Sequence, residues 1–145
     1  MYKHILLAYD GSEAGQQALL ESREIGQWSR AQMWLIAVMP SPVASIAVEA
    51  WTYAPGTEVA DRARHQAILD AGVQRLLEAG LDATGELVSG PAIEEIVRAA
   101  RAFSADLIVL GHQHRDSWAE RWWRGSMSKN LIEHAPCSVL VGVRP

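Results

Sequence analysis

Short apolar runs alternate along the chain with longer segments in which apolar residues recur every three or four positions. Five runs have the length and composition of β-strands: Ile5 to Tyr9, Met33 to Met39, Ala83 to Val88, Leu107 to Leu110 and Ser138 to Val143. The third run is the weakest because Gly85 interrupts it. The unbroken apolar character of the fourth and fifth is typical of parallel strands that are buried on both faces.

Four segments between these runs have the period of an amphipathic helix. The first follows Ser12, a good N-cap residue, and the third follows Gly90 and Pro91. The second spans Glu58 to Ala79, and the last starts at Ser126 and ends at Pro136. The inner face of the second helix is predicted to be a stripe that begins at Val59, Ala63 and Ala67 and continues at Leu69, Val73, Leu76 and Leu77. Residues Ser41 to Thr57 have no clear period and are predicted to form a loop.

This alternation predicts a single α/β domain over residues 1–145, with a parallel sheet and helices on both faces. A net charge of −4 disfavours sequence-independent nucleic-acid binding and binding to an anionic membrane surface. No signal peptide is predicted, because Met1 to Asp10 lacks a long apolar region and a small-residue cleavage site. No membrane helix is predicted either, because Pro40 and Pro42 interrupt the longest uncharged stretch. With Cys137 as the single cysteine, no disulfide can form within the chain.

Candidate chemistry is expected beyond the carboxyl ends of the strands, where ligands bind to open parallel sheets. The start of the last helix, Gly125-Ser126-Met127, suits a phosphate because free N–H groups attract anions and glycine allows close approach. A Gly-Ser pair is also an ordinary helix cap. His112 and His114 lack a third ligand, so no metal site is predicted, and no catalytic residue is predicted either.

The segments HILLAYDGS, LIAVMP, GPAIEEIVRAA, ADLIVLGHQH and GSMSKNLIEHAPCSVLVGV together resemble a domain of the universal stress protein (UspA-like) family. The resemblance covers the whole chain, in order. It implies an open five-stranded parallel sheet of order 3-2-1-4-5 with the adenine nucleotide alpha hydrolase-like fold, homodimers, and a cytoplasmic stress-response role. One branch of this family binds ATP or AMP, and another does not.

The nucleotide-binding branch is marked by Gly-x-x-Gly, nine residues, and then Gly-Ser or Gly-Thr. Gly111 and Gly125-Ser126 match this pattern, but His114 replaces the second glycine and the spacer is one residue longer. A side chain at this glycine position occupies space near the phosphates, although His114 is itself able to contact a phosphate. The resemblance further implies that Asp10 lies near the ribose and phosphates, that the Val38 backbone reads adenine, and that four residues line the site: Ala8, Leu110, Gln113 and Met127.

Two functions follow as expectations. The first is a regulatory protein that binds ATP or AMP, with or without Mg²⁺, and hydrolyses ATP slowly at most. The alternative is a stress-response interaction module that binds no nucleotide and acts as a homodimer through the edge strand Ser138 to Val143. The spacer Arg115 to Arg124 fits three roles: a lid over the phosphates, a single helical turn packed on the core, or a docking surface for a protein partner formed by Trp118, Trp122 and Trp123.

Overall fold

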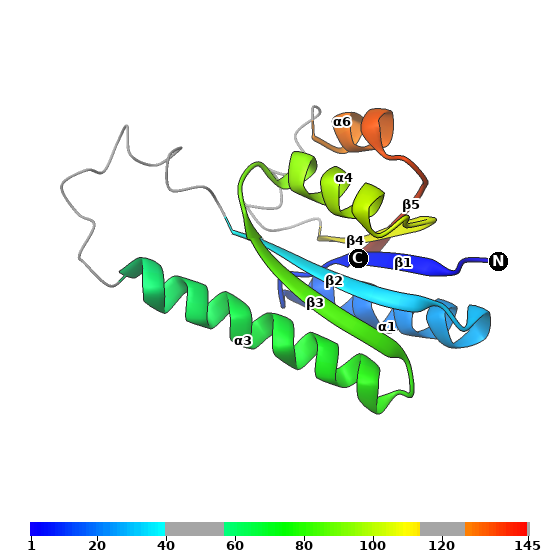
Figure 1. The fold of residues 1–145 in the computed structure, drawn as a ribbon, viewed down its shortest axis with the longest axis horizontal. Coiled ribbons are helices and arrows are strands. Elements are labelled where there is room, and N and C mark those ends of the chain that lie inside the picture. Colours follow the sequence, from blue (N-terminus) through cyan, green and yellow to red (C-terminus); the bar gives the residue numbers. More distant parts are fainter. Residues whose placement is uncertain (40–56, 114–126, 145) are drawn as a thin grey trace.

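The structure is a computed structural model, which describes residues 1–39, 57–113 and 127–144. One sheet of five parallel strands has the order β3-β2-β1-β4-β5, as predicted (Figure 1). The strands are β1 (His4–Ala8), β2 (Gln32–Met39), β3 (Asp82–Ser89), β4 (Leu107–Gln113) and β5 (Ser138–Arg144). The described helices are α1 (Glu13–Ser29), α3 (Thr57–Glu78), α4 (Ala92–Ala102) and α6 (Met127–His134).

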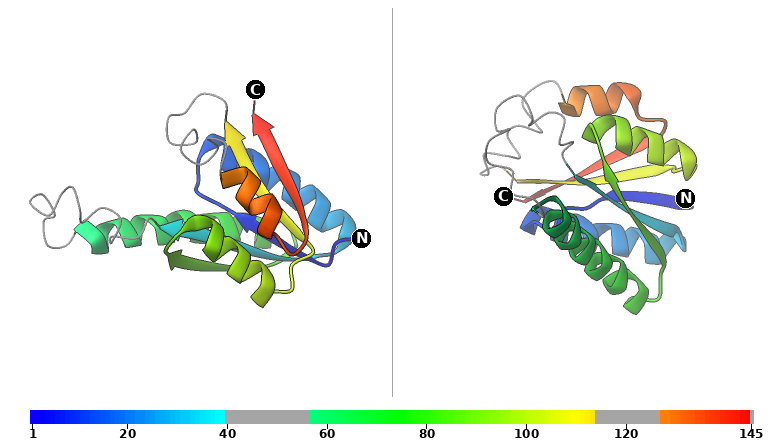
Figure 2. Two further views of the ribbon diagram at one scale, coloured as in Figure 1. Left: turned by 90° about the horizontal axis from the view of Figure 1, so that it is seen from above. Right: turned by 60° about the vertical axis from the view of Figure 1, so that its left-hand side comes forward.

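Helices cover both faces of the sheet, and each face has its own core. Successive side chains of a strand point to opposite faces, so Ile5 and Leu7 of β1 pack under α1 and α3, while Leu6 packs under α4 and α6. Figure 2 shows the two helical layers on either side of the sheet. The amphipathic period predicted for the segment after Gly90 and Pro91 is confirmed in α4, because Ile96, Val97 and Ala100 are all buried in the second core.

The predicted inner face of α3 is wrong in its first half. Val59 is 74% exposed, and Ala63 and Ala67 are exposed as well. Figure 1 shows the reason: the first turns of α3 extend past the ends of the neighbouring strands, where the sheet offers no surface to cover. Packing begins at Ile68 and Leu69 and continues at Leu76, whereas Leu77, also predicted on the inner face, is 46% exposed. The helix ends at Glu78, close to the end predicted from Gly80, which has a φ of +81°.

Two strand predictions also need correction. β4 does not stop at Leu110 but continues to Gln113, because it keeps pairing with β5 through Gly111↔Gly142 and Gln113↔Arg144. β5 is not buried on both faces: Val139, Leu140 and Val141 are half-buried and Val143 is 47% exposed. It lies at the edge of the sheet and, among the described strands, pairs with β4 alone. Across the described ranges, no helix has the length and apolar character needed to cross a membrane.

Candidate functional site

The carboxyl edge of the sheet is uneven, because its central strand is shorter than both neighbours. The last residue of β1, Ala8, pairs with Ile36 of β2 and Leu110 of β4. β2 then continues to Met39 and β4 to Gln113, three residues further in each case. Adjacent strands lie about 4.8 Å apart, so β2 and β4 are separated by about 10 Å at this level. This short end of β1 is also where the strand order reverses, the usual ligand position in such sheets.

Val38 presents main-chain polar groups at the short end of β1. The N–H and C=O of a strand residue point to one side, and that side alternates along the strand. Ile36 faces β1, since its C=O accepts the Tyr9 N–H at 2.9 Å, whereas the Met39 C=O accepts the Gly90 N–H on the β3 side. Val38 is two residues after Ile36, so its N–H and C=O point toward β1 beyond the last bond between these strands. A donor and an acceptor therefore lie side by side.

Three of the predicted site residues place apolar side chains on the α4–α6 face beside these groups. Ala8, Val38 and Leu110 all belong to or pack against the core on that face. Leu110 is 7% exposed, whereas Ala8 and Val38 are half-buried. The short end of β1 thus combines an apolar surface with a main-chain donor and acceptor, which is the usual composition of a small-molecule site.

Asp10 lies in the turn between β1 and α1, and the structure gives it a local role. Its Oδ1 accepts the Ser12 N–H at 2.9 Å and the Ser12 hydroxyl at 2.6 Å. Ser12 Oγ in turn accepts the Gly15 N–H at 3.0 Å and caps α1. The carboxylate therefore occupies the positive end of α1 and stabilises the turn. It remains exposed and keeps acceptor capacity for a ligand.

Gly111 is required by packing. A Cβ at this position would lie 2.3 Å from the Ala14 carbonyl oxygen and 2.9 Å from the Gly15 nitrogen. These are main-chain atoms of the first turn of α1, which no side-chain rotation can move away. The glycine therefore allows α1 to pack directly on β4, and it does so with or without a ligand.

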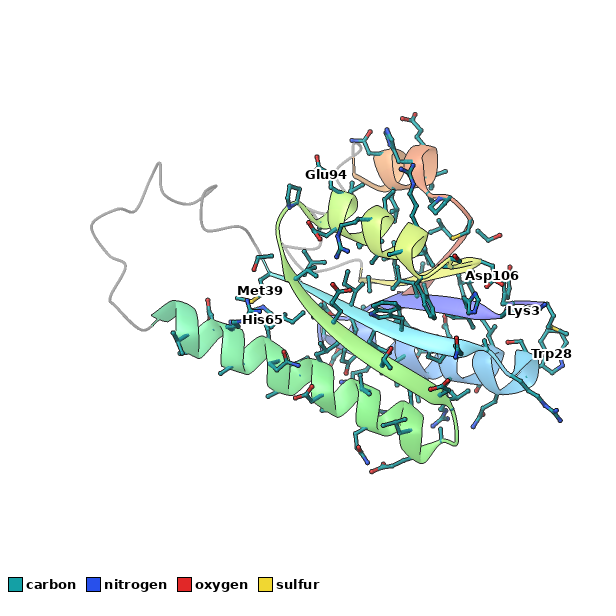
Figure 3. All side chains as sticks on the ribbon, viewed as in Figure 1. Lys3, Trp28, Met39, His65, Glu94 and Asp106 are labelled. Carbon is teal, nitrogen blue, oxygen red and sulfur yellow. The ribbon has the colours of Figure 1, made fainter. Side chains whose placement is uncertain are left out.

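Of the remaining predicted residues, the structure describes some and not others. Gln113 ends β4 and Met127 begins α6, so their main chains lie at the carboxyl edge. His114, Gly125 and Ser126 fall outside the described residues, as do Trp118, Trp122, Trp123 and residues 41–56 of the predicted loop. Figure 3 labels Met39 and His65 on the side of the molecule where β2 ends, while Lys3 and Asp106 lie on the opposite side, where β1 and β4 begin.

No group of three metal-binding side chains occurs in the part of the chain that is described. Cys137 is half-buried immediately before β5, and its burial, followed by the nearby Asp106 carboxylate, raises the pKa of its thiol. A raised pKa lowers the thiolate fraction at neutral pH, so this thiol is expected to be a weak nucleophile.

A polar contact set beside the site was not predicted. Gln16 Nε2 donates to the Tyr9 hydroxyl at 2.6 Å, and Arg75 donates to Gln16 Oε1. Burial is the main cause that raises the pKa of the Tyr9 phenol; Arg75 and Gln16 lower it, and Asp10 raises it. Nothing in the local sequence pattern links Arg75 to Gln16, which lies 59 positions away.

Comparison with known proteins agrees with this architecture. A curated universal stress protein of Thermus aquaticus is 32% identical over 144 residues, covering 97% of this chain and 98% of that protein. A solved structure from Burkholderia pseudomallei, of the universal stress protein family, is 28% identical and covers 97% of this chain and 95% of its own, with a TM-score of 0.75.

A second solved structure is a universal stress protein in complex with cAMP. It is 24% identical, covers 97% of this chain and 95% of its own, and has a TM-score of 0.67, so it supports the shared fold. These neighbours have the adenine nucleotide alpha hydrolase-like fold. The model of the universal stress protein family matches residues 1–144. The sheet order and this match over nearly the whole sequence show that the chain belongs to the universal stress protein family.

Proposed function

We propose that this chain is a cytoplasmic regulatory protein that binds an adenine nucleotide, ATP or AMP, at the short end of β1. The observation that carries the proposal is the orientation of the Val38 N–H and C=O, which point past the end of β1. Adenine offers an acceptor at N1 beside a donor at N6, so the base pairs with this donor and acceptor in one orientation. Ala8 and Val38 supply the apolar surface for its ring.

The sugar and phosphates extend from the base toward β4 and α6. The exposed Asp10 carboxylate only accepts hydrogen bonds, so it suits ribose hydroxyls better than phosphate oxygens. The start of α6 at Met127 offers main-chain N–H groups to the phosphates. Mg²⁺ would reduce the repulsion between phosphates and Asp10. The cAMP complex of a related protein supports an adenine nucleotide as the ligand class.

The protein is further proposed to form homodimers through the edge strand β5. Val143 is 47% exposed there, and Val139, Leu140 and Val141 are half-buried, so this edge carries apolar side chains that a second copy would cover. Light scattering at micromolar concentration is expected to give twice the chain mass. A monomer under these conditions would contradict the dimer without affecting the nucleotide site.

The first experiment is direct. Purified protein is denatured, and the supernatant is run on an anion-exchange column beside adenine-nucleotide standards. ATP, AMP and cAMP are then titrated by calorimetry, with and without Mg²⁺. ITP serves as the matched ligand, because its base carries N1–H and O6 and so reverses the donor and acceptor that Val38 pairs with. Binding of ATP at least tenfold tighter than ITP is expected, since two hydrogen bonds are mismatched.

Asp10→Asn tests the carboxylate without breaking the turn, because an asparagine oxygen also accepts the Ser12 N–H. Affinity is expected to fall about tenfold, as charged hydrogen bonds are stronger than neutral ones. The matched control is Asp82→Asn, which changes the same charge at the amino end of β3.

If the purified wild-type protein carries no nucleotide and the titrations give no heat, the nucleotide proposal is refuted. This result would favour the interaction module, with Trp118, Trp122 and Trp123 as its candidate surface.

A further inference from the structure

Helix α3 contacts the residues on both sides of Asp10. A Cβ at Gly72 would lie 2.7 Å from Tyr9 Cε1, so the Tyr9 ring rests directly on the α3 backbone. A Cβ at Gly11 would lie 2.6 Å from Ile68 Cγ2, so the α-carbon of Gly11 also meets this helix. Ile68 and Gly72 are four residues apart and therefore lie on one face of α3.

Arg75, one turn further along that face, reaches the first turn of α1. It donates to Gln16 Oε1, and Gln16 Nε2 donates to the Tyr9 hydroxyl at 2.6 Å. Tyr9 is 4% exposed, so its hydroxyl depends on this protein partner in place of water. The path from Arg75 through Gln16 to Tyr9 thus links α3 to the residue that precedes Asp10.

We propose that Arg75 is a positioning residue for the nucleotide site, acting through Gln16 and Tyr9 on the turn that presents Asp10. This inference rests on the proposed function, and it adds a dependence of that site on helix α3. Within the turn, the Ser12 and Gly15 N–H groups donate to Asp10 Oδ1 and Ser12 Oγ. Fixing Tyr9 and Gln16 from α3 limits how far this turn can rotate. A ligand that needs the Asp10 carboxylate in one position then binds without the entropic cost of ordering this turn.

Two readouts test this proposal, one of which needs no nucleotide. Amide exchange of Ser12 and Gly15, followed by NMR on the ligand-free protein, reports the turn directly. Nucleotide affinity by calorimetry reports its consequence. In Arg75→Ala, Gln16→Ala and Tyr9→Phe, exchange at these two amides is expected to accelerate and affinity to fall, each about fivefold, the value of one net hydrogen bond.

A double variant and a conservative substitution test whether Arg75 acts through Gln16. Arg75→Ala added to Gln16→Ala is expected to cause no further loss of affinity, because Arg75 acts through Gln16. Arg75→Lys keeps a donor and is expected to retain most of the affinity. Matched controls remove the same kinds of side chain elsewhere and are expected to change neither readout: Tyr2→Phe, Gln74→Ala and Arg98→Ala.

The outcomes separate the two proposals. Unchanged exchange and affinity in Arg75→Ala would overturn the positioning role and leave the nucleotide site standing. A loss in Arg75→Ala that adds fully to that of Gln16→Ala would overturn the path through Gln16. If exchange is faster in Arg75→Ala but the wild-type protein binds no nucleotide, Arg75 stabilises the turn only. Its role in a nucleotide site is then overturned, together with the proposed function.

Discussion

Replacing Gly111 with alanine is expected to destabilise the protein even when no nucleotide is present. The new Cβ would lie 2.3 Å from the Ala14 carbonyl oxygen and 2.5 Å from the Ala14 carbonyl carbon. An ordinary contact needs about 1 Å more, and both atoms belong to the main chain. The first turn of α1 must therefore move away from β4, which loosens the packing of Ala14 and Ala18 on the sheet.

The size of the effect follows from two opposing contributions. Overpacking a core by one methyl group costs about 1–3 kcal/mol, and the upper part of this range applies because no side chain can rotate away. Alanine also lowers the conformational entropy of the unfolded chain, which stabilises the folded state by about 0.4–1 kcal/mol. The net loss is about 2 kcal/mol. For a chain of this length the melting temperature should fall by roughly 6 °C.

The assay is urea unfolding of the nucleotide-free protein, followed by tryptophan fluorescence. Gly80→Ala is the matched control, because Gly80 has a φ of +81° and a Cβ added there would meet no atom within 4 Å. It should lose only the conformational cost of a left-handed residue, about 1 kcal/mol. If Gly111→Ala were as stable as the wild type and lost only nucleotide affinity, the packing explanation would be refuted and the glycine would belong to the ligand.

Three other perturbations test the turn, the buried phenol and the thiol. Ser12→Ala removes the α1 cap and should lower the free energy of unfolding by about 1 kcal/mol, measured in the same urea assay. The folded state raises the pKa of Tyr9 above its ordinary value near 10, so the unfolded state loses this proton first. Stability should therefore fall as pH rises above about 10, and Tyr9→Phe should reduce that slope; an equal slope in both proteins would contradict this. Cys137, whose pKa burial raises, should react slowly with a thiol reagent at pH 7.5 and much faster in unfolding concentrations of urea. Equal rates in both conditions would show that the thiol is accessible.

The fold could be predicted from the sequence because its strands have a strong local signal. Leu107 to Leu110 and Met33 to Met39 are unbroken apolar runs, and both are internal strands. The end of β4 could not be predicted in this way. Its last residues, Gly111 to Gln113, carry no strand pattern and are ordered by pairing with β5, a contact between segments distant in the sequence.

The first half of α3 illustrates a second limit. Val59, Ala63 and Ala67 have the spacing of a buried stripe, but periodicity does not show where the sheet ends. These residues lie beyond it and are exposed. The same limit applies to the path from Arg75 to Tyr9, since its hydrogen bonds depend on how α3 docks against α1. No local pattern in either helix encodes that docking.

The residues that resemble a nucleotide motif are not equally informative about a ligand. Gly111 is explained by its contact with α1, and Asp10 by its bonds to Ser12, so both would be needed in a protein of this fold that binds nothing. The Val38 main chain is different, because the end of β1 leaves its N–H and C=O pointing past the strand ladder. This feature does not depend on the identity of the Val38 side chain, which explains why a motif cannot encode it. The preference for ATP over ITP is therefore a sharper test of nucleotide binding than substitution of any motif residue, since it changes the ligand and leaves the fold intact.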